Sequence, residues 1–146
     1  MREKIKIFTD GGSRGNPGPA GIGVYITDAA DKEIFSLGQF LGTKTNNEAE
    51  YLAFLRALQF LSNYCQQAYA RGRELELEFY ADSKLLIEQL NKRWKIKEPR
   101  LLDLAQQAWR LLATLPYPSH LQHVLRADNK QADLLVNQAL DQATLA

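Results

Sequence analysis

Four acidic residues lie at predicted boundaries of secondary structure, and their side chains could hold a cation. Asp10 and Asp82 each follow an apolar strand pattern, in IFTDGG and FYADSK. Glu50 and Asp133 lie at the beginnings of helical patterns, in TNNEAEY and NKQADLL. Carboxylates gathered from distant segments repel one another unless a cation neutralises them. The pattern therefore favours a divalent-metal site. Spacing alone leaves open whether the four side chains converge. A lone Asp at the end of a strand is often only a turn former or a helix cap.

The elements that must position these carboxylates follow from the hydrophobic periodicity. Alternation of apolar and polar residues predicts strands at 4–9, 20–27, 33–41, 74–81 and 120–125. Apolar residues at steps of three and four predict a long helix from Thr45 or Asn46 to about Gly72, and further helices at 82–91, 99–115 and 129–143. Because helices separate the later strands, those strands require crossovers and parallel pairing.

The predicted architecture is one α/β domain over residues 1–146. Its five-stranded mixed sheet has three antiparallel strands followed by parallel ones, and helices flank it. Ligands in such open sheets bind beyond the carboxyl ends of parallel strands, which is where Asp10 and Asp82 are expected.

The glycine-rich segment GGSRGNPGPAG offers backbone groups that a ligand could approach closely. It lacks the Gly-Lys-Ser/Thr ending of a nucleotide-binding P-loop. Pro17 and Pro19 also prevent a helix from opening there, as a dinucleotide-binding fold requires. Taken by itself, the segment is best interpreted as a turn between strands.

The composition, 45% hydrophobic and 24% charged, is that of an ordinary soluble domain. No apolar run approaches the roughly 20 residues that span a membrane, and the N-terminal MREKIKIFTD lacks the apolar segment of a signal peptide. Cys65 is the single cysteine, so no internal disulfide can form, and a buried structural thiol in the cytoplasm is expected.

The net charge of +1 neither demands nor excludes a nucleic-acid partner. The dense basic segment KRWKIK at 92–97 contains an aromatic residue, Trp94. This segment is either a solvated connector between helices or a surface that contacts phosphates, and charge alone does not distinguish the two.

Together these segments resemble the type 1 ribonuclease H family over nearly the whole chain. Each motif is weak alone, whereas the ordered set is specific. The matching residues are Thr9-Asp10-Gly11-Gly12, Asn16-Pro17-Gly18, Thr45-Asn46-Asn47, Ala49-Glu50, Asp82-Ser83, Asn129 and Ala132-Asp133. The resemblance implies a ribonuclease H-like fold and an endonuclease that hydrolyses the RNA strand of RNA–DNA hybrids, leaving 5′-phosphate and 3′-hydroxyl ends.

The family holds two Mg²⁺ ions, with Mn²⁺ as a substitute, on an Asp-Glu-Asp-Asp set. By resemblance, Asp10 bridges both ions, Glu50 and Asp82 complete the protein ligands of one, and Asp133 serves the other. Glu48 also lies in the second motif. The family's glutamate, however, follows the second Asn by three residues, which selects Glu50 and leaves Glu48 as an exposed first-turn residue.

The resemblance also implies substrate contacts with an RNA–DNA hybrid. The expected contacts to RNA 2′-hydroxyls are Gly11, Gly12, Asn16 and Asn47. The expected contacts to the DNA strand and its phosphates are Thr45 and Asn46, and Ser83 and Trp94 are expected to line the DNA channel. Salt-sensitive phosphate contacts are expected from Lys92, Arg93, Lys95 and Lys97. A partly buried packing role for Trp94 is the alternative. We expect a monomer with no membrane partner.

Two departures from the family pattern indicate a compact subgroup. The link from about Lys92 to Pro99 is too short for the basic protrusion of many relatives. No His lies between Val124 and Asp133, where many relatives carry a mobile loop. Arg126 is a candidate for an electrostatic role there, and His123 is expected to be a structural or surface residue.

Two alternatives to an endonuclease that cuts RNA–DNA hybrids stay open. One is a catalytically silent hybrid-binding module, and the other is an enzyme of the same fold that cuts DNA.

Overall fold

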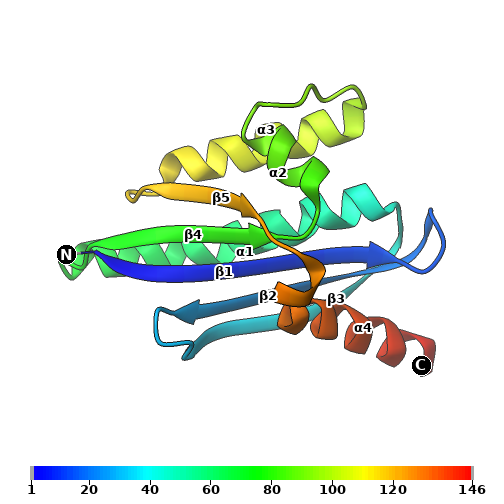
Figure 1. Ribbon diagram of the computed structural model, residues 1–146, viewed down its shortest axis with the longest axis horizontal. Helices are drawn as coiled ribbons and strands as arrows, with labels where there is room; N and C mark the ends of the chain where they lie inside the picture. The colour runs from blue at the N-terminus through cyan, green and yellow to red at the C-terminus, as the bar shows by residue number, and fades with distance from the viewer. Residues whose placement is uncertain (1, 146) are drawn as a thin grey trace.

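The structure is a computed structural model, and it describes residues 2–145. The strands are β1 (Glu3–Ser13), β2 (Gly18–Asp28), β3 (Glu33–Lys44), β4 (Leu75–Ala81) and β5 (Ser119–His123). The helices are α1 (Asn46–Ala70), α2 (Lys84–Leu90), α3 (Pro99–Thr114), the 3₁₀ turn η1 (Arg126–Asp128) and α4 (Lys130–Leu145). Figure 1 shows their arrangement around one sheet.

The strands form one five-stranded sheet in the order β3-β2-β1-β4-β5. The pairs β1–β2 and β2–β3 are antiparallel, whereas β1–β4 and β4–β5 are parallel. The predicted mixed sheet is therefore confirmed. Its parallel half arises because α1 and the α2–α3 pair carry the chain back to the same end of the sheet before β4 and β5 begin (Figure 1).

One boundary differs from the prediction in a way that affects the site. β1 continues to Ser13, so Asp10 lies inside the strand opposite Gly23 and not at the strand's end. The parallel pairing of β1 with β4, however, stops at Thr9 and Ala81. Asp10 and Asp82 therefore each follow the last residue of the parallel ladder. The predicted turn at 11–21 shrinks to residues 14–17, since its glycines extend the antiparallel hairpin.

Helices cover the sheet unequally (Figure 1). α1 lies across the face that carries Leu75, Leu77 and Phe79, all of which are buried, and α3 packs beside it. α4 lies on the opposite face over β2 and β3. That face of β4 and β5 carries no helix among the elements of residues 2–145.

The start of α1 is set by a capping box. The hydroxyl of Thr45 accepts a hydrogen bond from the backbone N–H of Glu48 (3.1 Å), and the carboxylate of Glu48 accepts one from the N–H of Thr45 (3.1 Å). Glu48 also pairs with Arg100 (3.4 Å). The expectation that Glu48 is an exposed residue is therefore wrong, because these two interactions hold its side chain half-buried.

Other sequence expectations concern the core and the later elements. Cys65 is a buried free thiol, as predicted. β5 ends at His123, so Val124 and Leu125 belong to the connection to η1 and not to the strand. Between residues 2 and 145, no helix combines the length and the apolar character that crossing a membrane would require.

Candidate active site

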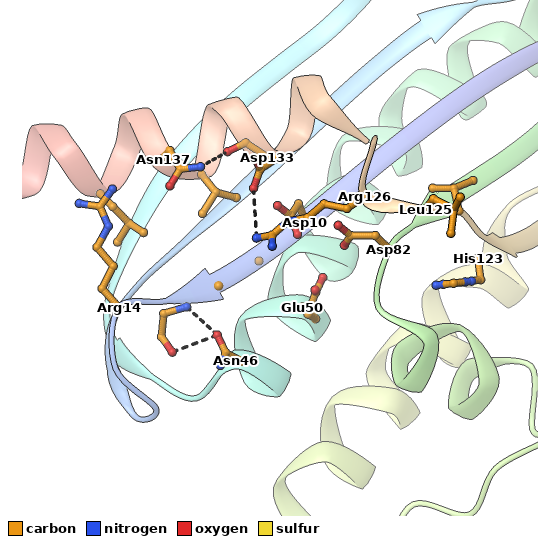
Figure 2. Close-up of a pocket in the computed structure, with 16 residues that line it drawn as sticks. Asp10, Arg14, Asn46, Glu50, Asp82, His123, Leu125, Arg126, Asp133 and Asn137 are labelled. Carbon is orange, nitrogen blue, oxygen red and sulfur yellow. Dashed lines mark hydrogen bonds and ion pairs between the residues drawn. The ribbon is translucent and has the colours of Figure 1, made fainter. Parts of the chain in front are cut away.

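Three of the four predicted carboxylates converge at the end of the parallel ladder. Asp10 comes from β1, Glu50 from the second turn of α1, and Asp82 from the residue after β4. One carboxylate oxygen from each lies within 4.8 Å of the other two. Figure 2 shows Asp10 and Asp82 side by side with Glu50 facing them from α1. Three segments that are distant in sequence therefore place their negative charges in one small volume.

The approach of Glu50 to Asp10 depends on a glycine. A Cβ on Gly11 would lie 2.3 Å from the carbonyl carbon and oxygen of Ala49 and 2.6 Å from the backbone nitrogen of Glu50. Real Cβ atoms do not come this close to a backbone. Because Gly11 has no side chain, β1 can lie directly against the first turns of α1, which brings Glu50 next to Asp10.

Asp133 approaches Asp10 from the opposite face of the sheet. The amide of Asn129 donates a hydrogen bond to the carbonyl of Thr9 (2.9 Å), and the Asp133 N–H donates to the Asn129 carbonyl (3.1 Å). These bonds tie the start of α4 to β1 beside Asp10. Asp133 lies outside the compact group of three, with its side chain 34% exposed, but it lines the same cavity.

The electrostatics of the cluster favour a bound cation. Burial, followed by the charges of Asp82 and Asp133, raises the pKa of Asp10 to about 8. Burial and the charges of Asp10 and Asp82 also raise the pKa of Glu50 well above its ordinary value. Among the residues that the structure describes, the buried Oε1 of Glu50 has no hydrogen-bond partner. A buried oxygen of this kind, within an excess of negative charge, fits an all-oxygen divalent-metal site.

Arg126 supplies positive charge to the cluster. Its Nη2 atom lies 3.9 Å from Oδ1 of Asp133, and its charge opposes the rise in the Glu50 pKa. Figure 2 shows its side chain reaching from η1 toward Asp133. The sequence suggested an electrostatic role for Arg126, and the structure places it where it can act on the cluster. His123 is exposed and lines the same cavity.

The glycine-rich segment at residues 11–21, which joins β1 to β2 and is called the glycine hairpin, forms the other wall of this cavity together with α1. The volume of the cavity is about 560 Å³. Oδ1 of Asn46 accepts hydrogen bonds from the backbone N–H (2.9 Å) and hydroxyl (3.1 Å) of Ser13. The N–H of Asn46 donates to Oδ1 of Asn16 (2.9 Å). Gly11 and Gly12 lie in the same wall. Asn16, a predicted ribose contact, and Asn46, a predicted contact to the DNA strand, are thus joined by one hydrogen-bond network beside Gly11 and Gly12.

Two predicted substrate residues lie elsewhere. The hydroxyl of Ser83 accepts a hydrogen bond from the N–H of Leu86 (3.1 Å) and so caps α2. Trp94 is exposed on the segment between α2 and α3, with Nζ of Lys84 5.9 Å from its ring centre. Neither residue lines the carboxylate cavity. A role for them requires a ligand long enough to extend from the carboxylates past α2.

The basic segment beside Trp94 is partly engaged within the protein. Arg93 makes two hydrogen bonds of 2.8 Å to the carboxylate of Glu88, and Nζ of Lys92 lies 4.8 Å from the ring centre of Trp109. Lys95 and Lys97 are exposed. The charge available for phosphate contacts is therefore smaller than the sequence suggests.

The cavity also contains residues that the sequence did not indicate, two of which belong to the glycine-rich segment. Ser13 and Arg14 line it beside the predicted glycines. Nη2 of Arg14 pairs with Oδ1 of Asp141 on α4 (2.7 Å), which joins the hairpin to the last helix. Their position within the glycine-rich segment was the available signal, but nothing in the sequence indicated a partner 127 residues away.

A sheet in the order β3-β2-β1-β4-β5, with carboxylates gathered at the end of its parallel ladder, defines the ribonuclease H-like class of folds. Structural comparison agrees. LC11-RNase H1, isolated from compost by a metagenomic approach, has a TM-score of 0.89 at 39% identity, over 97% of this chain and 98% of that one. The same protein in complex with an RNA/DNA hybrid gives a TM-score of 0.88 at 38% identity, over 96% of this chain and 99% of that one.

Sequence comparison narrows the class to a family. A family model described as "Reverse transcriptase-like" matches residues 8–139. Bifunctional protein Rv2228c of Mycobacterium tuberculosis is 40% identical over 141 residues, covering 96% of this chain and 36% of that protein. Ribonuclease HI of Halobacterium salinarum is 35% identical over 140 residues, covering 96% of this chain and 66% of that protein. The chain belongs to the type 1 ribonuclease H family, and it spans about a third to two thirds of the length of these two relatives.

Proposed function

We propose that this chain is an endonuclease that hydrolyses the RNA strand of RNA–DNA hybrids and leaves 5′-phosphate and 3′-hydroxyl ends. The observation that carries the proposal is the convergence of Asp10, Glu50 and Asp82, with a buried Glu50 oxygen that lacks a partner among the described residues. LC11-RNase H1 has been crystallised with an RNA/DNA hybrid, and its similarity to this chain supports the same class of substrate here.

The proposed cofactor is a pair of Mg²⁺ ions, with Mn²⁺ as a substitute. The family implies dependence on a divalent metal, and an all-carboxylate ligand set favours hard cations. Asp10 is the proposed shared ligand, because it belongs to the compact group with Glu50 and Asp82 and its carboxylate also interacts with Asp133. When bound, the ions would activate the attacking water and stabilise the leaving oxygen.

The remaining residues orient the substrate and tune the charge of the site. Arg126 compensates part of the negative charge around Glu50 and Asp133. The wall formed by the glycine hairpin and Asn46 presents polar groups that would face a minor groove, where 2′-hydroxyls distinguish RNA from DNA. Gly12 allows the substrate to approach the backbone of β1 closely. The space beside it is open, since a Cβ added there would have only Oδ1 of Asn46, at 3.9 Å, within van der Waals range.

The other proposed contacts come from residues near this wall and along α2. Thr45, which caps α1, and Asn47, in its first turn, are proposed to contact the hybrid together with Asn16. Ser83 and Trp94 are proposed to follow the DNA strand beyond the cavity. A long hybrid that runs from the carboxylates past α2 would reach them, so these two contacts are expected to affect affinity more than the chemical step.

Three further features belong to the proposal. The chain acts as a single domain and as a monomer. It represents a compact form of the family, because residues 91–98 connect α2 to α3 without an intervening helix and η1 occupies the connection that leads to Asp133. A catalytically silent binding module is the weaker candidate, since the four carboxylates of the family set are all present.

Cleavage of labelled substrates tests the proposal directly. The wild type should cut an RNA–DNA hybrid in the presence of Mg²⁺ or Mn²⁺, only within the RNA strand, and should leave double-stranded DNA intact. Asp10→Asn should bind the hybrid but not cut it. Binding without cleavage by the wild type with either metal would indicate the silent module, and cleavage of double-stranded DNA would indicate the wrong substrate class.

A further inference from the structure

A second group of metal-ligating side chains lies on the open face of the sheet, away from the carboxylate cavity. It consists of Glu76 and Glu78 on β4 and His120 on β5. Glu78 and His120 are direct partners across the β4–β5 ladder, and Glu76 points to the same face because it lies two residues before Glu78. One ligand atom from each residue lies within 4.8 Å of the other two. None of the three takes part in the proposed nuclease reaction.

The spacing suits a small divalent ion. Nε2 of His120 lies 3.2 Å from Oε1 of Glu76. A tetrahedral ion with bonds of about 2.1 Å holds its ligand atoms about 3.4 Å apart, so this pair is already close to the required separation. The three side chains come from two hydrogen-bonded strands and not from loops, so the backbone holds their relative positions before any ion binds.

The surroundings of Glu78 compensate its charge only in part. Its side chain is only 8% exposed. Oε2 accepts a hydrogen bond from the amide of Gln122 (2.7 Å), whereas the cation nearest Oε1 is the ammonium of Lys4, at 3.9 Å. This separation is beyond hydrogen-bonding distance. A buried carboxylate requires close compensation of its charge, and one loosely placed ammonium beside two glutamates supplies only part of it.

A surface hollow gives an ion access to these ligands. Glu76, Glu78, His120 and Gln122 line it, together with Arg93. The guanidinium of Arg93 does not neutralise the glutamates, because it is held by two hydrogen bonds to Glu88. His120 is half exposed, so water could complete the coordination.

We propose that Glu76, Glu78 and His120 bind a divalent transition-metal ion such as Zn²⁺ at a site separate from the carboxylate cavity. The imidazole distinguishes this site from the all-carboxylate cluster, since imidazole favours zinc and related metals over Mg²⁺. An ion bound there joins β5, the edge strand of the sheet, to β4 through side chains. It therefore stabilises the strand from which the chain continues to Arg126.

Calorimetric titration of Zn²⁺ into the intact chain at neutral pH tests the site. Excess Mg²⁺ in the solution keeps the carboxylate cavity supplied with the metal proposed for it. The expected result is a Zn²⁺ site that His120→Ala and Glu76→Gln each weaken at least tenfold. The matched control is His123→Ala, because His123 is the second of the two histidines in the sequence and ends the same strand. This control should retain the site with unchanged affinity.

Thermal unfolding provides a second readout that does not depend on nuclease activity. Zn²⁺ should raise the unfolding temperature of the parent chain and of His123→Ala, but not that of Glu76→Gln, which is the deciding variant if His120→Ala folds poorly. The proposal is overturned if the parent binds no Zn²⁺ under these conditions. It is also overturned if the affinity survives both ligand substitutions, or if His123→Ala removes it.

Discussion

Asp10 and Gly23 face each other across the β1–β2 ladder, and the missing side chain of Gly23 determines how close α4 can come to Asp10. A Cβ on Gly23 would lie 2.1 Å from the carbonyl oxygen of Ala132, the residue immediately before Asp133. The contact between a strand glycine and a helix backbone thus sets the distance between two carboxylates of the proposed metal site.

Replacing Gly23 with Ala should therefore damage both stability and activity. The added methyl group must push α4 away from the sheet, which we expect to cost about 1–3 kcal/mol of unfolding free energy and to lower hybrid cleavage through displacement of Asp133. Gly21→Ala is the matched control, because Gly21 lies on the same strand and a Cβ there would lie 3.4 Å from its nearest neighbours, which are atoms of Gln39 on β3 and of Val136 and Leu140 on α4. Urea unfolding and cleavage rates measure the two effects, and equal behaviour of the two variants would contradict the argument.

Substitutions at Glu48 and Glu50 should affect different properties, stability at Glu48 and hybrid cleavage at Glu50. Glu50→Gln should reduce hybrid cleavage at least a thousandfold, equivalent to about 4 kcal/mol in the barrier, because it removes a proposed metal ligand. Glu48→Ala should retain most of the activity but lose about 1 kcal/mol of stability with the capping box. Cleavage assays and thermal unfolding of both variants check this assignment. The opposite pattern would place the catalytic glutamate at 48.

The metal-free protein should lose stability as the pH rises. Burial and the neighbouring carboxylates hold the pKa of Asp10 at about 8 in the folded state, above its value in the unfolded chain. Between about pH 4 and pH 8 the folded state therefore binds a proton that the unfolded state has released, so the free energy of unfolding falls with pH. In the presence of a chelator, Asp10→Asn should remove this contribution and be more stable than the parent at pH 8 by about 1–3 kcal/mol.

The comparison between parent and variant isolates the cluster from the other titrating groups. Urea unfolding at pH 5 and pH 8 provides the four free energies. A difference between parent and Asp10→Asn that stays constant over this range would show that Asp10 titrates normally. Added Mg²⁺ should stabilise the parent more at pH 8 than at pH 5, because the ion binds deprotonated carboxylates.

Arg126 should contribute charge to the site and not stability. Its side chain is largely exposed, and its contact with Asp133 is 3.9 Å long, so Arg126→Gln should change the free energy of unfolding by less than about 0.5 kcal/mol. Hybrid cleavage should fall about tenfold, and Arg126→Lys should restore part of it. Unchanged cleavage by Arg126→Gln at saturating metal would remove Arg126 from the proposed machinery.

Local patterns in the sequence were sufficient for much of the fold. Periodicity and capping signals depend on neighbouring residues, so they identified α1 with its start at Thr45 or Asn46, the strand that precedes Asp82, and the burial of Cys65. The ordered motifs indicated the ribonuclease H family and selected Glu50 over Glu48 as the candidate ligand. The structure then placed Glu50, and not Glu48, beside Asp10.

The sequence by itself therefore determined which elements form, their order, and which carboxylates were candidates. Tertiary structure alone decided that Asp10 lies within a strand, that three carboxylates converge while Asp133 lies slightly apart, and that Ser83 and Trp94 lie outside the cavity. The physical reason is that a hydrophobic period specifies the buried face of one element, whereas distances between elements depend on contacts between remote residues. The approach of Ala132 to Gly23 and the bond from Asn129 to Thr9 are such contacts, and no local pattern encodes them.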